Sequence, residues 1–97
     1  MNLLNFSWLI ENQISGHSAP MNEADLKFLK SKGVKALVRM QETNLVLITS
    51  DQIKKLGFVD FHVPVVDFMA PTQNQIDSII TFIEDSIMKG LPVGISC

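Results

Sequence analysis

The residue best suited to covalent chemistry in this sequence is Cys97, its only cysteine, which follows the stretch LPVGIS. That stretch begins after Leu91 with a proline and continues with small or β-branched residues, a pattern typical of a buried strand. In open α/β sheets, ligands bind just beyond the carboxyl ends of the strands. A thiolate at Cys97 could therefore act as a nucleophile, provided that a loop with anion-binding N–H groups follows it. The alternative is an unreactive cysteine that ends a buried strand.

Asp67 is the second candidate for chemistry. It lies in the segment VVDFMAP, between a predicted strand and a predicted helix, with Val66 and Phe68 as its neighbours. An acid in an apolar loop tends to have a raised pKa, as a proton donor requires. The alternative is an ordinary loop aspartate that makes a turn contact. Asp60 competes less well, because the alternating strand pattern predicts that its side chain faces outward.

The histidines and the single arginine give weaker signals. His17 and His62 have no ligand-like spacing with each other or with Cys97, so we expect no metal site. His62 fits the face of a strand. Arg39 is predicted to be solvated or ion-paired near Glu42.

Strands and helices alternate along the predicted chain. Asn22 can cap a helix whose buried face contains Leu26 and Leu29 and which stops at Gly33. A second, longer helix begins at Thr72 and carries isoleucines at helical spacing. We predict one or two short strands in 6–16, a helix in 22–32, a strand in 34–41, a short helix at 51–56 capped by Ser50, a strand in 58–65, a helix in 72–89 and a strand in 91–97, with 45–48 left as strand or connector.

This order predicts an α/β fold with a mostly parallel sheet flanked by helices. The final strand is apolar on both faces, so it should be central in the sheet and covered on both sides. Because another helix normally follows such a strand, we expect a layer that these residues do not supply.

Composition restricts the classes of function. The sequence has 97 residues, enough for one small domain, and its apolar fraction of 46% suits a packed core. Its formal net charge is −2 with scattered lysines, so we expect neither nucleic acid nor a membrane surface as a partner. One cysteine cannot form an internal disulfide, and no apolar run is long enough to span a membrane. We expect a soluble protein of the cytoplasm or nucleus, of unknown oligomeric state.

An ordered set of segments resembles the small atypical dual-specificity phosphatases, within the cysteine-based protein tyrosine phosphatase superfamily. The resemblance implies a protein-tyrosine-phosphatase-like fold and hydrolysis of phosphotyrosine, with some phosphoserine or phosphothreonine capacity, without metal or cofactor. It places Cys97 at the nucleophile of the family signature, which reads His-Cys, five residues, Arg. It places Asp67 at the general acid and base of a mobile loop. The matching segments are NFSWLI, ISGHSAP, FLKSKGVKALVRMQE, FHVPVVDFMAPTQNQID and LPVGISC.

Two departures from the family pattern qualify this resemblance. Ser96 stands where the signature usually has a histidine that helps to tune the cysteine. The phosphate loop, its arginine and the later helices of the family have no counterpart in residues 1–97. We therefore expect 1–97 to be the N-terminal portion of a single catalytic domain, inactive by itself.

Two other classes of function remain open from the sequence. A rhodanese-type sulfurtransferase also has a cysteine between a strand and an anion-binding loop, but it does not need an acid at Asp67. A truncated or pseudophosphatase module would bind phosphoproteins without turnover, and the missing arginine favours that alternative.

Overall fold

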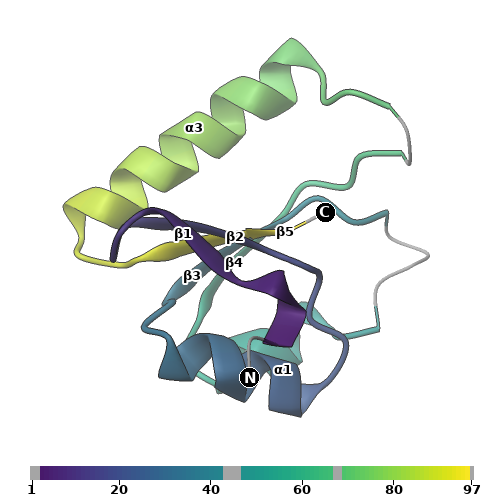
Figure 1. Ribbon diagram of the computed structural model, residues 1–97. Helices are drawn as coiled ribbons and strands as arrows, with labels where there is room; N and C mark the ends of the chain where they lie inside the picture. Colours follow the sequence, from purple (N-terminus) through teal and green to yellow (C-terminus); the bar gives the residue numbers. More distant parts are fainter. Residues whose placement is uncertain (1–2, 43–46, 67–68, 97) are drawn as a thin grey trace.

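The computed structural model describes residues 3–42, 47–66 and 69–96. Its elements in chain order are η1 (Leu3–Asn5), β1 (Ser7–Ile10), β2 (Ile14–His17), α1 (Glu23–Ser31), β3 (Ala36–Arg39), α2 (Ser50–Lys55), β4 (Val59–His62), α3 (Gln73–Met88) and β5 (Val93–Ser96). Five strands form one sheet in the order β1-β2-β5-β3-β4. Helix α3 covers one face of the sheet and α1 the other (Figure 1).

The sheet confirms the predicted fold class. Strands β2, β5, β3 and β4 are parallel to their neighbours, whereas β1 pairs with β2 as an antiparallel hairpin. The hairpin turn places Asn12 at φ 62°, in the left-handed region that asparagine tolerates better than most residues. Strand β5 lies between β2 and β3, so the prediction that the last strand is central is confirmed.

The face covered by α1 and α2 holds the larger core. Helix α1 begins as predicted, with the Asn22 side chain accepting a hydrogen bond from the Asp25 N–H at 2.9 Å. The chain leaves the helix through Gly33 at φ 96°, a conformation that suits glycine. The buried members of this core are Phe6, Leu26, Leu29, Val34, Leu37, Ile48, Ile53 and Phe58.

Among the described elements, α3 is the one that covers the opposite face. A capping box between Thr72 and Gln75 starts this helix at the predicted place. The predicted apolar stripe is correct only in part, because Ile80 is 48% exposed. The side chains that pack on the buried Ala36, Val38 and Val93 include Ile79, Phe82 and Ile83. Across the described ranges, none of the helices combines the length and apolar character that a membrane crossing requires.

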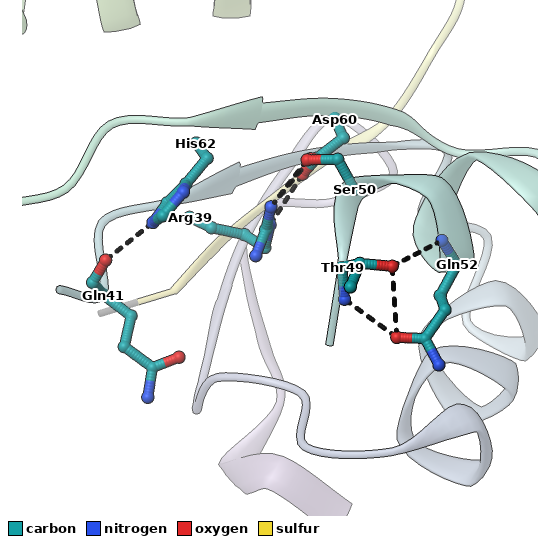
Figure 2. A network of polar contacts seen from close by, with 7 residues as sticks. All are labelled: Arg39, Gln41, Thr49, Ser50, Gln52, Asp60 and His62. Atoms are coloured by element: carbon teal, nitrogen blue, oxygen red, sulfur yellow. Dashed lines mark hydrogen bonds and ion pairs between the residues drawn. The ribbon is translucent and has the colours of Figure 1, made fainter. Parts of the chain in front are cut away.

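The segment between β3 and α2 differs from the prediction. Helix α2 is capped by Thr49, not by Ser50, because the Thr49 and Gln52 side chains form a reciprocal capping box (Figure 2). Thr49 and Ser50 both carry a hydroxyl that can cap a helix. Thr49 is favoured because Gln52, three residues later, can complete a capping box with it. Leu47 and Ile48 are not part of a strand, and positions 45 and 46 lie outside the described residues.

Candidate active site

The carboxyl ends of the four parallel strands each carry one polar residue. The strand register pairs His17 of β2 with Ser96 of β5, Ser96 with Arg39 of β3, and Arg39 with His62 of β4. Residues paired in register share one face of a sheet. This face is the one covered by α1, because Leu37, two residues before Arg39, belongs to that core. We call His17, Ser96, Arg39 and His62 the polar row.

The β3–β4 end of the polar row is a closed network of charged and polar groups (Figure 2). Arg39 binds Asp60 through two parallel hydrogen bonds, Nε to Oδ1 at 2.7 Å and Nη2 to Oδ2 at 2.8 Å. Ser50 at the start of α2 donates to Asp60 Oδ2 at 2.6 Å and accepts from Arg39 Nη2 at 3.2 Å. The side chains of the ion pair are only 5% and 2% exposed. The network therefore fixes the start of α2 to the ends of two strands.

This network overturns two predictions. Arg39 pairs with Asp60, not near Glu42, and Asp60 faces the core instead of solvent. Burial by itself raises the pKa of Asp60, but hydrogen bonds from Arg39 and Ser50, together with the arginine charge, hold that pKa below its usual value. A charge on an otherwise apolar strand needs a partner. The sequence therefore indicates that Arg39 has a partner, but it does not identify Asp60, which lies 21 residues further along the chain.

Backbone hydrogen bonds extend the strand pairing past the polar row. The Met40 N–H donates to the Ser96 carbonyl at 2.9 Å, and the Val65 N–H donates to the Met40 carbonyl at 3.0 Å. The Gln75 side chain of α3 also donates to the Pro64 carbonyl, at 3.1 Å. These contacts anchor both the end of β5 and the segment that follows β4.

The β2–β5 end of the polar row is buried and uncharged. His17 is 8% exposed, and its Nδ1 lies 2.7 Å from the Ser18 carbonyl. Burial, partly offset by that hydrogen bond, lowers the pKa of His17, so its imidazole is neutral at neutral pH. Ser96 is 1% exposed. Neither His17 Nε2 nor Ser96 Oγ has a hydrogen-bond partner among the described residues.

The two residues predicted to perform the chemistry adjoin these anchored segments in sequence. Cys97 directly follows Ser96, and Asp67 directly follows Val66. Both lie outside the described residues, so their roles stay predictions. In the described ranges there is no group of three or more histidine, cysteine, aspartate or glutamate side chains arranged to hold a metal ion.

Residues 12–97 match a protein family described as Tc-R-P, polymorphic toxin system, DSP-PTPase phosphatase. The match begins in the turn between β1 and β2 and includes the whole parallel part of the sheet. This chain belongs to the Tc-R-P family. The family and the fold together identify a phosphatase domain of the dual-specificity and protein tyrosine phosphatase type.

Solved phosphatase structures share the fold of this Tc-R-P chain. Tk-PTP in its active form is 27% identical, with a TM-score of 0.80 over 88% of this chain and 56% of that chain. PTPMT1 in complex with PI(5)P is 20% identical, with a TM-score of 0.76 over 90% of this chain and 59% of that chain. A putative phosphatase from Shewanella putrefaciens CN-32 is 19% identical, with a TM-score of 0.75 over 95% of this chain and 57% of that chain. The chain thus spans less than two thirds of each of these solved chains.

Proposed function

We propose that this chain supplies the nucleophile and the general acid of a cysteine-dependent protein phosphatase. The observation that carries the proposal is the family match over residues 12–97, which runs through the central strand β5 up to Cys97. The finer resemblance is to the catalytic-domain-only type represented by dual-specificity phosphatase 23. The substrate would be a phosphorylated protein or peptide, with phosphotyrosine preferred and phosphoserine or phosphothreonine also accepted.

The proposed reaction has two steps. The Cys97 thiolate attacks phosphorus, so a sulfur–phosphorus bond forms while the bond from phosphorus to the leaving oxygen breaks, and Asp67 protonates that oxygen. Water then attacks the cysteinyl phosphate with Asp67 as the base, releasing inorganic phosphate and the thiolate. Splitting the reaction in this way replaces one difficult displacement by two easier ones.

The developing negative charge on the phosphoryl oxygens needs cationic donors, and the arginine of the polar row is already paired. Arg39 is the only arginine in the sequence, and both its Nε and one Nη atom are committed to Asp60. The proposal therefore assigns phosphoryl binding to a loop and an arginine outside these residues, as the family signature implies. It follows that residues 1–97 by themselves should not turn over an aryl phosphate.

The cellular setting is also part of the proposal. The family description concerns polymorphic toxin systems, and we extend that setting to this chain. A reactive thiol is kept reduced most readily in the cytoplasm, so we propose that the protein acts there.

Substitutions at the two proposed catalytic residues test this function in the intact protein. Cys97→Ser should abolish hydrolysis of an aryl phosphate, and Asp67→Asn should slow it by ~10²–10⁴-fold. Asp77→Asn is the matched control, since Asp77 lies on the exposed surface of α3, where it accepts a hydrogen bond from Gln73. Unchanged hydrolysis by Cys97→Ser would remove the proposed function.

A panel of substrates separates the related possibilities. Phosphotyrosine, phosphoserine and phosphothreonine peptides test the substrate preference, and a phosphoinositide tests a lipid substrate of the kind named for PTPMT1. Release of sulfite from thiosulfate would instead indicate a sulfurtransferase. Tight binding of phosphopeptides without turnover would indicate a non-catalytic binding module.

A further inference from the structure

A cavity between helices α1 and α2 shares no residue with the polar row. It has a volume of about 370 Å³, which is in the size range of small-molecule sites. Its apolar lining consists of Met21, Leu26, Leu47, Ile48 and Leu56. These residues come from α1 and the segment before it, from the segment that leads into α2, and from the end of α2. The proposed phosphatase chemistry leaves this cavity without a role.

The apolar residues of the cavity differ in depth. Leu26 and Ile48 belong to the core and are 1% and 4% exposed, whereas Met21 and Leu47 are 57% and 70% exposed. The cavity therefore has a buried aliphatic inner wall and an apolar mouth that faces solvent. A ligand with an aliphatic chain would remove the side chains at the mouth from water, and burial of apolar surface favours such binding.

The polar side chains of the cavity are engaged, with one exception. The Asn22 side chain caps α1, and the Gln52 side chain belongs to the capping box of α2. Glu23 Oε1 lies 3.4 Å from Lys27 Nζ, so its charge is paired. Lys55 also lines the cavity, and its ammonium group has no hydrogen-bond or ion-pair partner among the described residues. The unpaired charge of the cavity is therefore positive.

The α2 side of the cavity carries further positive charge. The Lys30 ammonium donates a hydrogen bond at 3.0 Å to the carbonyl of Leu56, which is part of the cavity wall. Lys54 precedes Lys55 in the last turn of α2. Three ammonium groups in one region raise the local electrostatic potential, so this side of the cavity favours an anion.

We propose that this cavity binds a medium-chain aliphatic carboxylate, with its chain against the apolar lining and its carboxylate beside Lys55. A peptide with an apolar C-terminal residue shares this head group. Its backbone N–H and C=O groups would, however, need hydrogen-bond partners that the aliphatic side chains of the inner wall do not supply. The proposal is independent of the phosphatase function, since no residue of the cavity takes part in that chemistry.

The test is a titration of the nitrogen-15-labelled protein with sodium octanoate below its micellar concentration, followed by amide chemical shifts. Octylammonium has a chain of the same length with the opposite charge, acetate has the same head group without the chain, and N-acetyl-leucyl-leucine presents the carboxylate on a peptide. We expect saturable shifts with octanoate at the amides of α1 and α2 around the cavity. Octylammonium should bind at least about tenfold more weakly, because Lys55 then repels the head group. Acetate should show no saturable shift, and the peptide should bind more weakly than octanoate.

Four variants separate the cavity from the rest of the surface. Lys55→Gln should weaken octanoate binding by about threefold to fivefold, while Lys54→Gln, the neighbouring lysine that does not line the cavity, should have a smaller effect. Leu47→Ser should weaken binding by about fivefold, because part of the apolar mouth is lost. Leu9→Ser is its control, since Leu9 is 71% exposed on β1, outside the cavity. All four side chains are exposed, so we expect the variants to fold.

Several results would overturn the proposal. They are equal affinities for octanoate and octylammonium, equal effects of Lys55→Gln and Lys54→Gln, equal effects of Leu47→Ser and Leu9→Ser, and tighter binding of N-acetyl-leucyl-leucine than of octanoate. Shifts of the same amides with protein concentration, in the absence of octanoate, would show that a second copy of the chain occupies the cavity and would also overturn it. None of these results depends on whether Cys97→Ser abolishes phosphate hydrolysis, so failure of this proposal is distinguishable from failure of the proposed function.

Discussion

The two ends of the polar row satisfy their buried polar groups in opposite ways. At the β3–β4 end, Arg39, Asp60 and Ser50 satisfy one another through four hydrogen bonds. At the β2–β5 end, His17 Nε2 and Ser96 Oγ are uncharged and have no partner among the described residues. Both ends lie at the carboxyl ends of the parallel strands. The difference in hydrogen bonding therefore comes from the residue types and not from the strand topology.

This contrast indicates that the two ends of the polar row have different roles. A closed, charged network tolerates no change of partner, which suits a frame that fixes α2 to the sheet. Uncharged groups with unused hydrogen-bonding capacity suit a place where function needs an adaptable contact. Cys97, the proposed nucleophile, directly follows this second end in sequence.

The largest effect should come from breaking the charged end. Arg39→Met leaves the Asp60 carboxylate buried without its cation, which typically costs about 3–5 kcal/mol in the free energy of unfolding. Ser96→Ala at the other end removes a buried hydroxyl that has no partner among the described residues, so it should change the free energy of unfolding by less than about 1 kcal/mol. Urea unfolding of the two variants measures the difference. Equal losses of stability in Arg39→Met and Ser96→Ala would contradict the assignment of the charged β3–β4 end to the structural framework.

A smaller effect should come from crowding the uncharged end. In Gly94→Ala the new methyl group meets His17 Nε2 at 2.5 Å and Val34 Cγ1 at 3.1 Å, so the imidazole must move. Such overpacking typically costs about 1–3 kcal/mol in the free energy of unfolding. Gly16→Ala on β2 is the control, since its Cβ would meet nothing within 4 Å and should leave stability nearly unchanged. Similar losses in both variants would show that the space above Gly94 is not special.

The two ends should also respond to acid in different pH ranges. His17 has a folded pKa below 6.5, so folding favours its neutral form, and the stability it contributes is complete above 6.5 and declines as the pH falls toward the folded pKa. Asp60 has a folded pKa below 3.8, so its contribution is complete above 3.8 and is lost as the pH falls through the folded pKa. Either slope is at most about 1.4 kcal/mol per pH unit. In a plot of the free energy of unfolding against pH, His17→Leu should lose the decline that begins below pH 6.5, and Asp60→Asn should lose the decline that begins below pH 3.8. A variant that keeps the decline assigned to its group would show that the assignment is wrong.

Much of the fold could be predicted from local patterns. Helix α1 between Asn22 and Gly33 and helix α3 from Thr72 follow from caps and apolar spacing within a few residues. The central place of β5 was predicted from its apolar side chains on both faces. Such a strand is typically covered by helices on both faces, inside a parallel sheet. These signals are short in range, so the sequence contains them directly.

The polar row could not be predicted, because it depends on which strands become neighbours and in which register. Arg39 and Asp60 come from different strands, and the pairing of His17 with Ser96 joins the second strand to the last. Local patterns leave both choices open. Cys97 and Asp67 were found by residue type and family resemblance, and their chemistry stays a prediction that kinetics must test.

Trapping of the covalent intermediate tests the central claim most directly. The intact protein and its Asp67→Asn and Cys97→Ser variants are mixed with an aryl phosphate, quenched in acid within the first turnover and digested, and the phosphorylated peptide is identified by mass. We expect a phosphoryl group on the peptide that contains Cys97, and none on that peptide in Cys97→Ser. The group should accumulate most in Asp67→Asn, because hydrolysis of the cysteinyl phosphate then lacks its base. Hydrolysis that proceeds in Cys97→Ser, or a phosphoryl group on another residue, would contradict the account.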